Sequence, residues 1–202
     1  SAVRGDGEEW IFGQMPAWSS DGRRIAYHGC DERGDDCSVW VMQPGGFNAA
    51  RLTTDPSDTA PAWSPDGEHI AYWSDISGEY EIYLQDSAMN AEPEKLTNRN
   101  KGFGYALFWS PDSKKLAFID ETNNIFIIDV QSREVTVAGN TNWNISHGGR
   151  FGYPIAWSPD SRWLAYAKAG NNYLRQIILW SVAEEKGTAI TNELADSHHP
   201  TW

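Results

Sequence analysis

The chain has 202 residues, of which 40% are hydrophobic and 13% aromatic, and its formal net charge at pH 7 is -12. This composition supports a large hydrophobic core and excludes a disordered chain, while the absence of a clustered Lys/Arg block excludes a typical nucleic-acid binder. No apolar run is long enough for a transmembrane helix. Residues 1–10 contain no apolar stretch of the signal-peptide type, so we expect that any export signal has already been removed.

The first predicted element is a lone strand at residues 8–12, and a repeated pattern follows it. Tryptophans recur at intervals of about 45 residues, which is the sequence signature of a repeat architecture. The segments that begin at the first four read WSSDGRRIAY, WSPDGEHIAY, WSPDSKKLAF and WSPDSRWLAY. The five tryptophans are Trp18, Trp63, Trp109, Trp157 and Trp202.

The second repeat predicts four short antiparallel strands. Residues 60–63 and 69–73 are rich in apolar and aromatic residues, and Ser-Pro-Asp-Gly joins them as a tight turn in which Pro presets φ and Gly supplies a left-handed position. Residues 80–84 alternate as a third strand, and residues 95–97 form the fourth. The other repeats match this one, with third strands at 39–41, 125–128 and 177–180 and fourth strands at 51–53, 135–137 and 189–191.

Four-stranded antiparallel units of this length predict an all-β fold, with each unit forming one blade of a β-propeller. We expect a single domain over residues 1–202, with an incomplete fifth blade. Terminal strands at 8–12 and 198–202 would close the ring within one chain or pair with a second chain as a homodimer, since strand exchange is a low-cost route to a dimer. The four full blades are expected at about 15–53, 59–97, 104–137 and 152–191.

The two cysteines, Cys30 and Cys37, fall at the ends of adjacent predicted strands. Strand ends of this kind are close enough for a disulfide, so we expect a Cys30–Cys37 bond and an oxidising compartment; two reduced thiols on a hairpin are the alternative. Zinc is disfavoured, because two thiolates need two more ligands and the candidates between the cysteines are acidic. For residues 31–36, a solvated acidic hairpin is favoured over a calcium site.

Loops between blades are the expected location of a binding site, since binding residues usually lie on loops carried by a rigid scaffold. The candidate loops are residues 54–59, 98–105, 139–153 and 192–199. The third is the longest, and its aromatic and cationic side chains suit a peptide carboxylate or a polar sugar. A loop that buries its own tryptophan is the alternative. The predicted ligand-binding residues are Trp143, His147, Arg150 and Tyr153.

No catalytic site, cofactor or bound metal is predicted. The chain has no G-x-S-x-G motif, so the HGG sequence at residues 147–149 has no nucleophile to serve. His198 and His199 are adjacent, and neighbouring strand residues point to opposite faces, which disfavours joint metal binding. The aspartates of the repeated turn occur once per blade, as expected of turn formers; they are Asp21, Asp66, Asp112 and Asp160.

The signature P-x-W-S-P-D-G-x-x-I-A-Y, followed by E-I-Y and K-L-T, resembles the repeat of TolB-like propellers over essentially the whole chain. Residues 108–135 and 152–182 also resemble the propeller blades of tricorn-type peptidases, whereas the first half is more similar to free-standing bacterial TolB-type repeats. The change falls near residues 98–104. Natural divergence explains it, and so does a chimera or designed protein assembled from two half-propellers.

The TolB resemblance implies a periplasmic module that accepts a protein or peptide at its channel mouth. The tricorn-type resemblance implies a substrate-gating domain whose protease lies elsewhere in a longer chain. We therefore expect a non-catalytic scaffold or protein-interaction module, extracytoplasmic if natural, with no nucleic-acid partner and no membrane insertion. An engineered or excised assembly without a selected ligand is a further interpretation. A carbohydrate-binding propeller is the other alternative, although the unequal loops count against a lectin.

Overall fold

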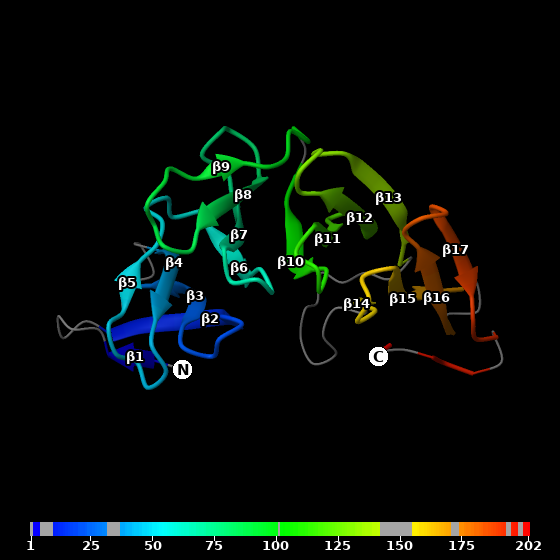
Figure 1. Cartoon of the computed structure of the whole chain (residues 1–202), viewed down its shortest axis with the longest axis horizontal. Coiled ribbons are helices and arrows are strands. Elements are labelled where there is room, and N and C mark those ends of the chain that lie inside the picture. Colours follow the sequence, from blue (N-terminus) through cyan, green and yellow to red (C-terminus); the bar gives the residue numbers. More distant parts are fainter. Residues whose placement is uncertain are drawn as a thin grey trace. The chain divides into compact units, whose positions relative to one another are not determined.

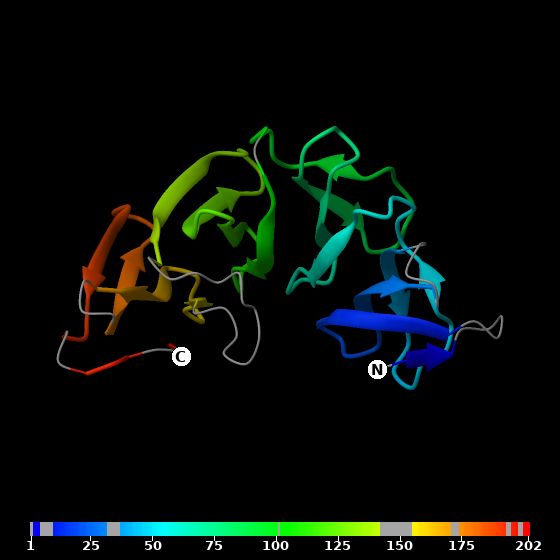
Figure 2. The same ribbon diagram turned by 180° about the vertical axis from the view of Figure 1, so that it is seen from behind.

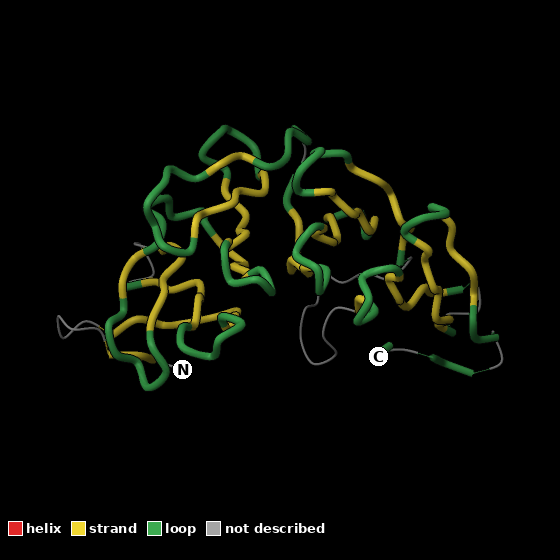
Figure 3. The backbone as a smooth tube through the Cα atoms, viewed as in Figure 1, coloured by secondary structure: helices red, strands yellow, loops and turns green. Residues whose placement is uncertain are grey.

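The computed structural model describes residues 2–4, 10–31, 37–100, 102–141, 155–170, 174–192, 195–197 and 200–202. All regular secondary structure in these ranges is β-strand, as Figure 1 and Figure 3 show, which confirms the all-β prediction. Across the described residues, no helix is long and apolar enough to cross a membrane.

The described strands form four antiparallel sheets, and within each sheet the order in space follows the order in the chain (Figure 2). This arrangement confirms the predicted blades of a β-propeller. The first sheet contains β1 (Ala2–Arg4), β2 (Trp10–Trp18), β3 (Ile25–Cys30), β4 (Cys37–Met42) and β5 (Ala50–Arg51). The second contains β6 (Thr59–Trp63), β7 (His69–Ser74), β8 (Glu81–Asp86) and β9 (Glu94–Lys95). The third contains β10 (Gly104–Trp109), β11 (Lys115–Asp120), β12 (Asn124–Asp129) and β13 (Val135–Asn140), and the fourth β14 (Ile155–Trp157), β15 (Trp163–Ala169), β16 (Arg175–Ser181) and β17 (Lys186–Ala189).

The two chain ends differ from the prediction. Residues 10–12 are not a lone strand but the start of β2, and the additional strand is β1, which pairs with β2. Pro16 interrupts the pattern in the sequence, yet β2 continues through it with a bulge between Gln14 and Ala17, where a missing N–H is tolerated. At the other end, residues 200–202 form no strand, so the predicted terminal strand is wrong for the part that the structure describes.

The chain divides into two compact units, residues 1–107 and residues 108–202. In the first unit, neighbouring sheets pack through the repeated tryptophan, since Trp63 of the second sheet contacts Ala26 and Val41 of the first. The Arg24 guanidinium lies 4.6 Å from the centroid of the Trp63 ring and donates a hydrogen bond to the Ser87 carbonyl. Trp63 is therefore a packing residue, whereas Trp18, the other repeated tryptophan of this unit, is 57% exposed.

In the second unit, the repeated tryptophans make one recurring hydrogen bond. The Trp157 indole N–H donates to the carbonyl of Phe108 at 2.9 Å, and the Trp202 indole N–H donates to the carbonyl of Ala156 at 3.2 Å. Each acceptor directly precedes the tryptophan of the preceding repeat. Trp202 thus occupies the position of a fifth repeated tryptophan, although no strand surrounds it.

The repeated Ser-x-Asp turn is held by the same network in all four sheets. In each turn the serine hydroxyl donates to the aspartate, and the aspartate accepts the backbone N–H two residues further on. Hydrogen bonds from the Ser158 hydroxyl and from Arg162 lower the pKa of Asp160 to about 2. The pKa values of Asp21 and Asp112 are lowered as well, so these three turn aspartates are ionised groups with a structural role.

Ser110→Ala is expected to lower the free energy of unfolding of the second unit by about 1–3 kcal/mol. The hydroxyl of this fully buried serine donates to Asp112 and accepts the Lys115 N–H, so its removal leaves both groups without that partner. Urea unfolding followed by tryptophan fluorescence measures the change. Ser132→Ala removes an exposed turn hydroxyl from the same unit as a control; equal stabilities of the two variants would contradict the structural role of Ser110.

Candidate functional site

The predicted ligand-binding residues Trp143, His147, Arg150 and Tyr153 lie outside the described residues, and so do His198 and His199. Residues 139–140 belong to β13 and not to a loop, and residues 142–153 lie outside the described residues, so a binding loop there stays a prediction. The structure does contain the expected disulfide: Cys30 on β3 lies directly opposite Cys37 on β4, and their sulfurs are bonded.

Reduction of the disulfide in the absence of metal is expected to lower the stability of the first unit by about 2.5 kcal/mol, the loop-entropy value for a cross-link with a sequence separation of 7 residues. Urea unfolding with and without a phosphine reductant measures this difference. The Cys30→Ser/Cys37→Ser double variant, tested without reductant, should match the reduced wild type. A reduced protein as stable as the oxidised one would show that the cross-link constrains nothing in the unfolded chain.

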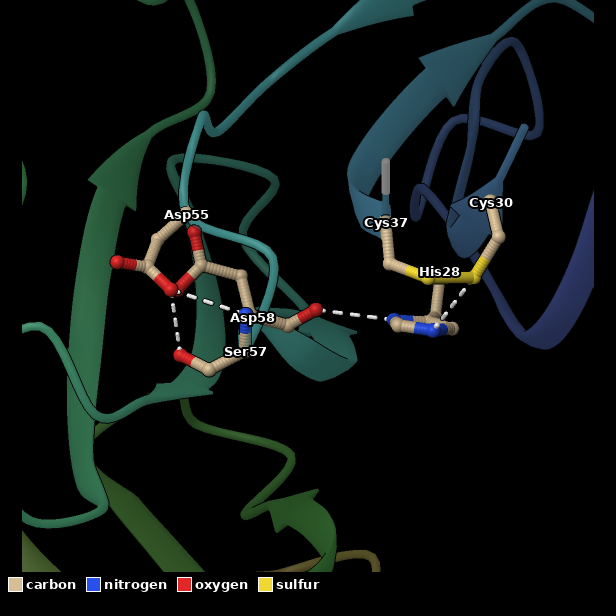
Figure 4. The surroundings of a disulfide bond; sticks show 6 residues. All are labelled: His28, Cys30, Cys37, Asp55, Ser57 and Asp58. Atoms are coloured by element: carbon tan, nitrogen blue, oxygen red, sulfur yellow. Dashed lines mark hydrogen bonds between the residues drawn. A yellow bond between two sulfur atoms is a disulfide. The ribbon is translucent and has the colours of Figure 1, made fainter. Parts of the chain in front are cut away.

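His28 lies beside the disulfide, as Figure 4 shows. Its Nδ1 is 2.9 Å from the backbone carbonyl oxygen of Asp58, and its Nε2 is 3.5 Å from Cys30 Sγ. Because a carbonyl can only accept, Nδ1 carries the proton, and in the neutral ring Nε2 presents its lone pair to the sulfur. His28 was not selected from the sequence. The sequence did contain a signal for His28, because a residue two positions before Cys30 on the same strand lies on the same face as Cys30.

A cavity of about 450 Å³ lies in the first unit, next to the segment that leads from β5 to β6. Its walls come from that segment, from the paired strands β7 and β8, and from the loop before β9. The lining residues are Leu52, Thr53, Thr54, Asp55, Asp58, Tyr72, Ser74, Ile76, Tyr83, Gln85, Met89, Ala91, Glu92 and Pro93.

The cavity is acidic. Its lining contains Asp55, Asp58 and Glu92, and no Lys, Arg or His. The rings of Tyr72 and Tyr83 stack with their centroids 6.1 Å apart. Burial, followed by the charge of Asp58, raises the pKa of Tyr72, so its hydroxyl stays protonated at neutral pH. The described lining therefore offers negative charge and neutral hydroxyls to a ligand.

Asp58 is the most unusual group of the cavity. Only 2% of its surface is exposed, and its Oδ1 has no hydrogen-bond partner among the described residues. Burial raises its pKa against the opposing effect of hydrogen bonds from Ser74 and Thr53. A buried carboxyl oxygen without a partner costs free energy, and such exceptions call for a functional or structural reason.

The local turn explains how the chain holds Asp58 in place. The Asp55 carboxylate accepts both the backbone N–H and the hydroxyl of Ser57, and the Asp58 N–H donates to the Asp55 carbonyl at 3.2 Å (Figure 4). With its own carbonyl bonded to His28, Asp58 is fixed on both sides of its backbone. Its carboxyl group is therefore positioned before any ligand arrives.

Apolar side chains accompany the carboxyl groups in the lining. Ile76 is 65% exposed and Met89 is 43% exposed, so both offer apolar surface to solvent and to a ligand. Carboxyl groups together with accessible apolar side chains fit a ligand with an aliphatic stem and a cationic end, such as a lysine side chain.

A smaller cavity of about 110 Å³ in the second unit has a different character. It is lined by residues that include Lys115, Asp129, Glu134 and Glu185. Lys115 Nζ lies 2.6 Å from Asp129 Oδ2, so charges of opposite sign are already paired there. This cavity is a weaker candidate for a charged ligand.

The family model described as the TolB beta propeller domain matches residues 11–202. No curated protein matches the chain in sequence.

Three solved structures with a similar fold are distant from this chain in sequence. TolB from Acinetobacter baumannii is 17% identical, with a TM-score of 0.69 over 98% of this chain and 55% of that protein. A putative TolB from Agrobacterium tumefaciens is 22% identical, with a TM-score of 0.62 over 90% of this chain and 62% of that one. The acylaminoacyl peptidase of Pyrococcus horikoshii is 14% identical, with a TM-score of 0.64 over 90% of this chain and 32% of the peptidase. This chain thus spans less than two thirds of each.

Proposed function

Because the chain belongs to the TolB beta propeller domain family, we propose that it is a non-catalytic protein-interaction module and that the acidic cavity of its first unit receives a basic side chain of a protein partner. The observation that carries this proposal is Asp58 Oδ1, a buried carboxyl oxygen without a hydrogen-bond partner among the described residues that line the cavity. A positively charged donor is the group that satisfies such an oxygen best.

The size and chemistry of the cavity support a side-chain ligand. A volume of about 450 Å³ lies within the range of ligand sites, and it exceeds what a bound ion alone would need. The ammonium group of a lysine would meet Asp58 and Asp55, while its methylene stem would contact Ile76 and Met89. Each charge-assisted hydrogen bond contributes roughly 1.5–3 kcal/mol.

The carbohydrate-binding alternative depends on Trp143 and Tyr153, which lie outside the described residues, and the cavity of the first unit does not support it. Sugars stack on open aromatic faces, but Tyr72 is only 3% exposed and Tyr83 only 8% exposed. The substrate-gating alternative is favoured by one observation, the fold shared with an acylaminoacyl peptidase of which this chain covers 32%. A substrate gate would also bind polypeptide without catalysing a reaction. It differs from our proposal because its protease would lie elsewhere in a longer natural chain.

Two further parts of the proposal concern location and assembly. The Cys30–Cys37 disulfide supports an extracytoplasmic location, because disulfides persist in oxidising compartments. Self-association of the chain stays a proposal, and light scattering across a dilution series tests it. A monomer at all concentrations would contradict the predicted homodimer.

An array of short peptides that vary one central residue tests the proposed function. We expect wild-type protein to bind peptides with a central Lys or Arg and to bind the Ala and Glu series weakly. Asp58→Asn should lose this preference, whereas Glu68→Gln, which removes the same charge from an exposed position, should keep it. Equal binding of the Lys and Glu series by wild-type protein would overturn the proposal, and so would turnover of any peptide.

A further inference from the structure

We propose that reduction of the Cys30–Cys37 disulfide creates a zinc site whose ligands are the two thiolates and His28 Nε2. In the oxidised structure the three ligand atoms already lie within 4.8 Å of one another. This inference does not depend on the proposed binding of a basic side chain, because it concerns the face of β3 and β4 at the disulfide.

The orientation of His28 is that of a metal ligand. Metal-binding histidines usually donate their second ring N–H to a carbonyl or carboxylate, which fixes the tautomer and the ring plane. Here Nδ1 donates to the Asp58 carbonyl at 2.9 Å, and this bond directs the Nε2 lone pair to the sulfur of Cys30. A disulfide sulfur carries no proton, so Cys30 Sγ does not donate a hydrogen bond to the Nε2 lone pair.

The distances suit tetrahedral zinc. With Zn–S of about 2.3 Å and Zn–N of about 2.0–2.1 Å, the nitrogen and a sulfur of a tetrahedral site lie about 3.5 Å apart. Nε2 and Cys30 Sγ are 3.5 Å apart in the structure. Once the S–S bond is broken, the sulfurs need a separation of about 3.8 Å, which rotation of the cysteine side chains on paired strands can supply.

Zinc binding follows reduction of the disulfide. A dithiol reductant gives two electrons and two protons to the disulfide, becomes a disulfide itself and leaves two protein thiols. Zinc then displaces both thiol protons and accepts the lone pair of neutral His28, so the two thiolate charges neutralise Zn²⁺. Three protein ligands leave the fourth position open for water or for a ligand.

The sequence disfavoured zinc because the candidate ligands between the cysteines are acidic. The third ligand comes from the residues before Cys30 and not from those between the cysteines. His28 precedes Cys30 by two positions and shares its face of β3. This spacing of two residues places the His28 imidazole beside the disulfide.

Cobalt is the probe for the test, because Co²⁺ bound by thiolates shows sulfur-to-metal charge-transfer bands. The protein is reduced with a phosphine, freed of reductant without oxygen and titrated with Co²⁺ and then Zn²⁺. We expect one Co²⁺ per chain with thiolate charge transfer, displacement by Zn²⁺, and no such bands in the oxidised protein. Absence of charge transfer in the reduced protein would overturn the proposal.

His28→Gln separates this site from a non-specific thiol pair. We expect it to weaken Co²⁺ binding at least about 100-fold, whereas His69→Gln, which removes a histidine near exposed Asp66 and Glu68, should bind like wild type. Equal affinity of His28→Gln and wild type would overturn the assignment of His28. Near-UV circular dichroism of the reduced apo-protein must retain the native tryptophan signal; its loss would show that no preformed site exists and would equally reject the proposal.

Discussion

Asp58→Asn is expected to make the first unit more stable at neutral pH while abolishing its preference for basic peptides. The variant keeps the size of the side chain but removes its charge, and this residue is only 2% exposed. Burial of an ionised carboxylate costs more free energy than burial of a neutral amide of the same size, so a gain of about 1 kcal/mol is expected at pH 7. Loss of one charged hydrogen bond should weaken binding of a lysine peptide about 10–100-fold.

The stability gain should depend on pH in a defined direction. Burial raises the pKa of Asp58 above its unfolded value, so the folded state holds the proton more tightly than the unfolded state. Wild-type stability relative to the variant is therefore greatest below the unfolded pKa of about 3.9 and falls as the pH rises through the folded pKa. Thermal unfolding from pH 4 to pH 7 should show the difference widening. A variant that is less stable than wild type at pH 7 would contradict this account of Asp58.

Gly104→Ala is expected to destabilise the first unit by about 3 kcal/mol, the upper part of the range for overpacked cores. A Cβ atom at residue 104 would lie 2.1 Å from Cζ2 of the Trp73 ring. That ring cannot move aside easily, because it is fully buried and its N–H donates to the Tyr105 carbonyl at 2.7 Å. Urea unfolding followed by near-UV circular dichroism measures the loss.

A double-mutant cycle with Trp73→Phe separates this steric effect from any destabilisation by alanine at residue 104 that does not involve Trp73. The smaller ring removes the atoms that the new Cβ would meet, so Gly104→Ala should cost much less in the Trp73→Phe background. Equal costs in both backgrounds would show that the contact with Trp73 is not the cause.

The strands could be predicted from the sequence because each lies between recognisable turns. The second strand predicted at residues 69–73 lies within β7, and the third strands predicted at 39–41, 125–128 and 177–180 lie within β4, β12 and β16. The remaining third strand, β8, begins at Glu81, one residue after the predicted start. The fourth strands, which lie at sheet edges, were predicted less accurately; β9, for example, covers Glu94–Lys95 and not residues 95–97. Glycine proved unnecessary for the left-handed turn position, since Ser113 and Ser161 adopt φ of 60° and 61° there.

The cavity could not be predicted, because it is assembled from segments that the sequence separates. Residues 54–59 were recognised as an inter-blade loop, but nothing in that stretch shows that Asp58 is buried while Asp55 forms the turn. Tyr72 and Ser74, which line the cavity together with Asp58, come from β7, and Ser74 forms a hydrogen bond with the Asp58 side chain. Likewise, the position of His28 at the disulfide depends on the carbonyl of Asp58, a contact between residues 30 positions apart.

The most direct test of the acidic cavity is a nuclear magnetic resonance titration with three small probes of one size: pentylammonium, pentanol and pentanoate. Methyl signals of Ile76 and Met89 and ring signals of Tyr72 and Tyr83 report on the cavity from four of its lining residues. We predict saturable shifts of these signals with pentylammonium, weak shifts with pentanol and none with pentanoate. Shifts of equal size with pentylammonium and pentanoate, or none at these four residues, would contradict the assignment of the cavity as a site for basic side chains.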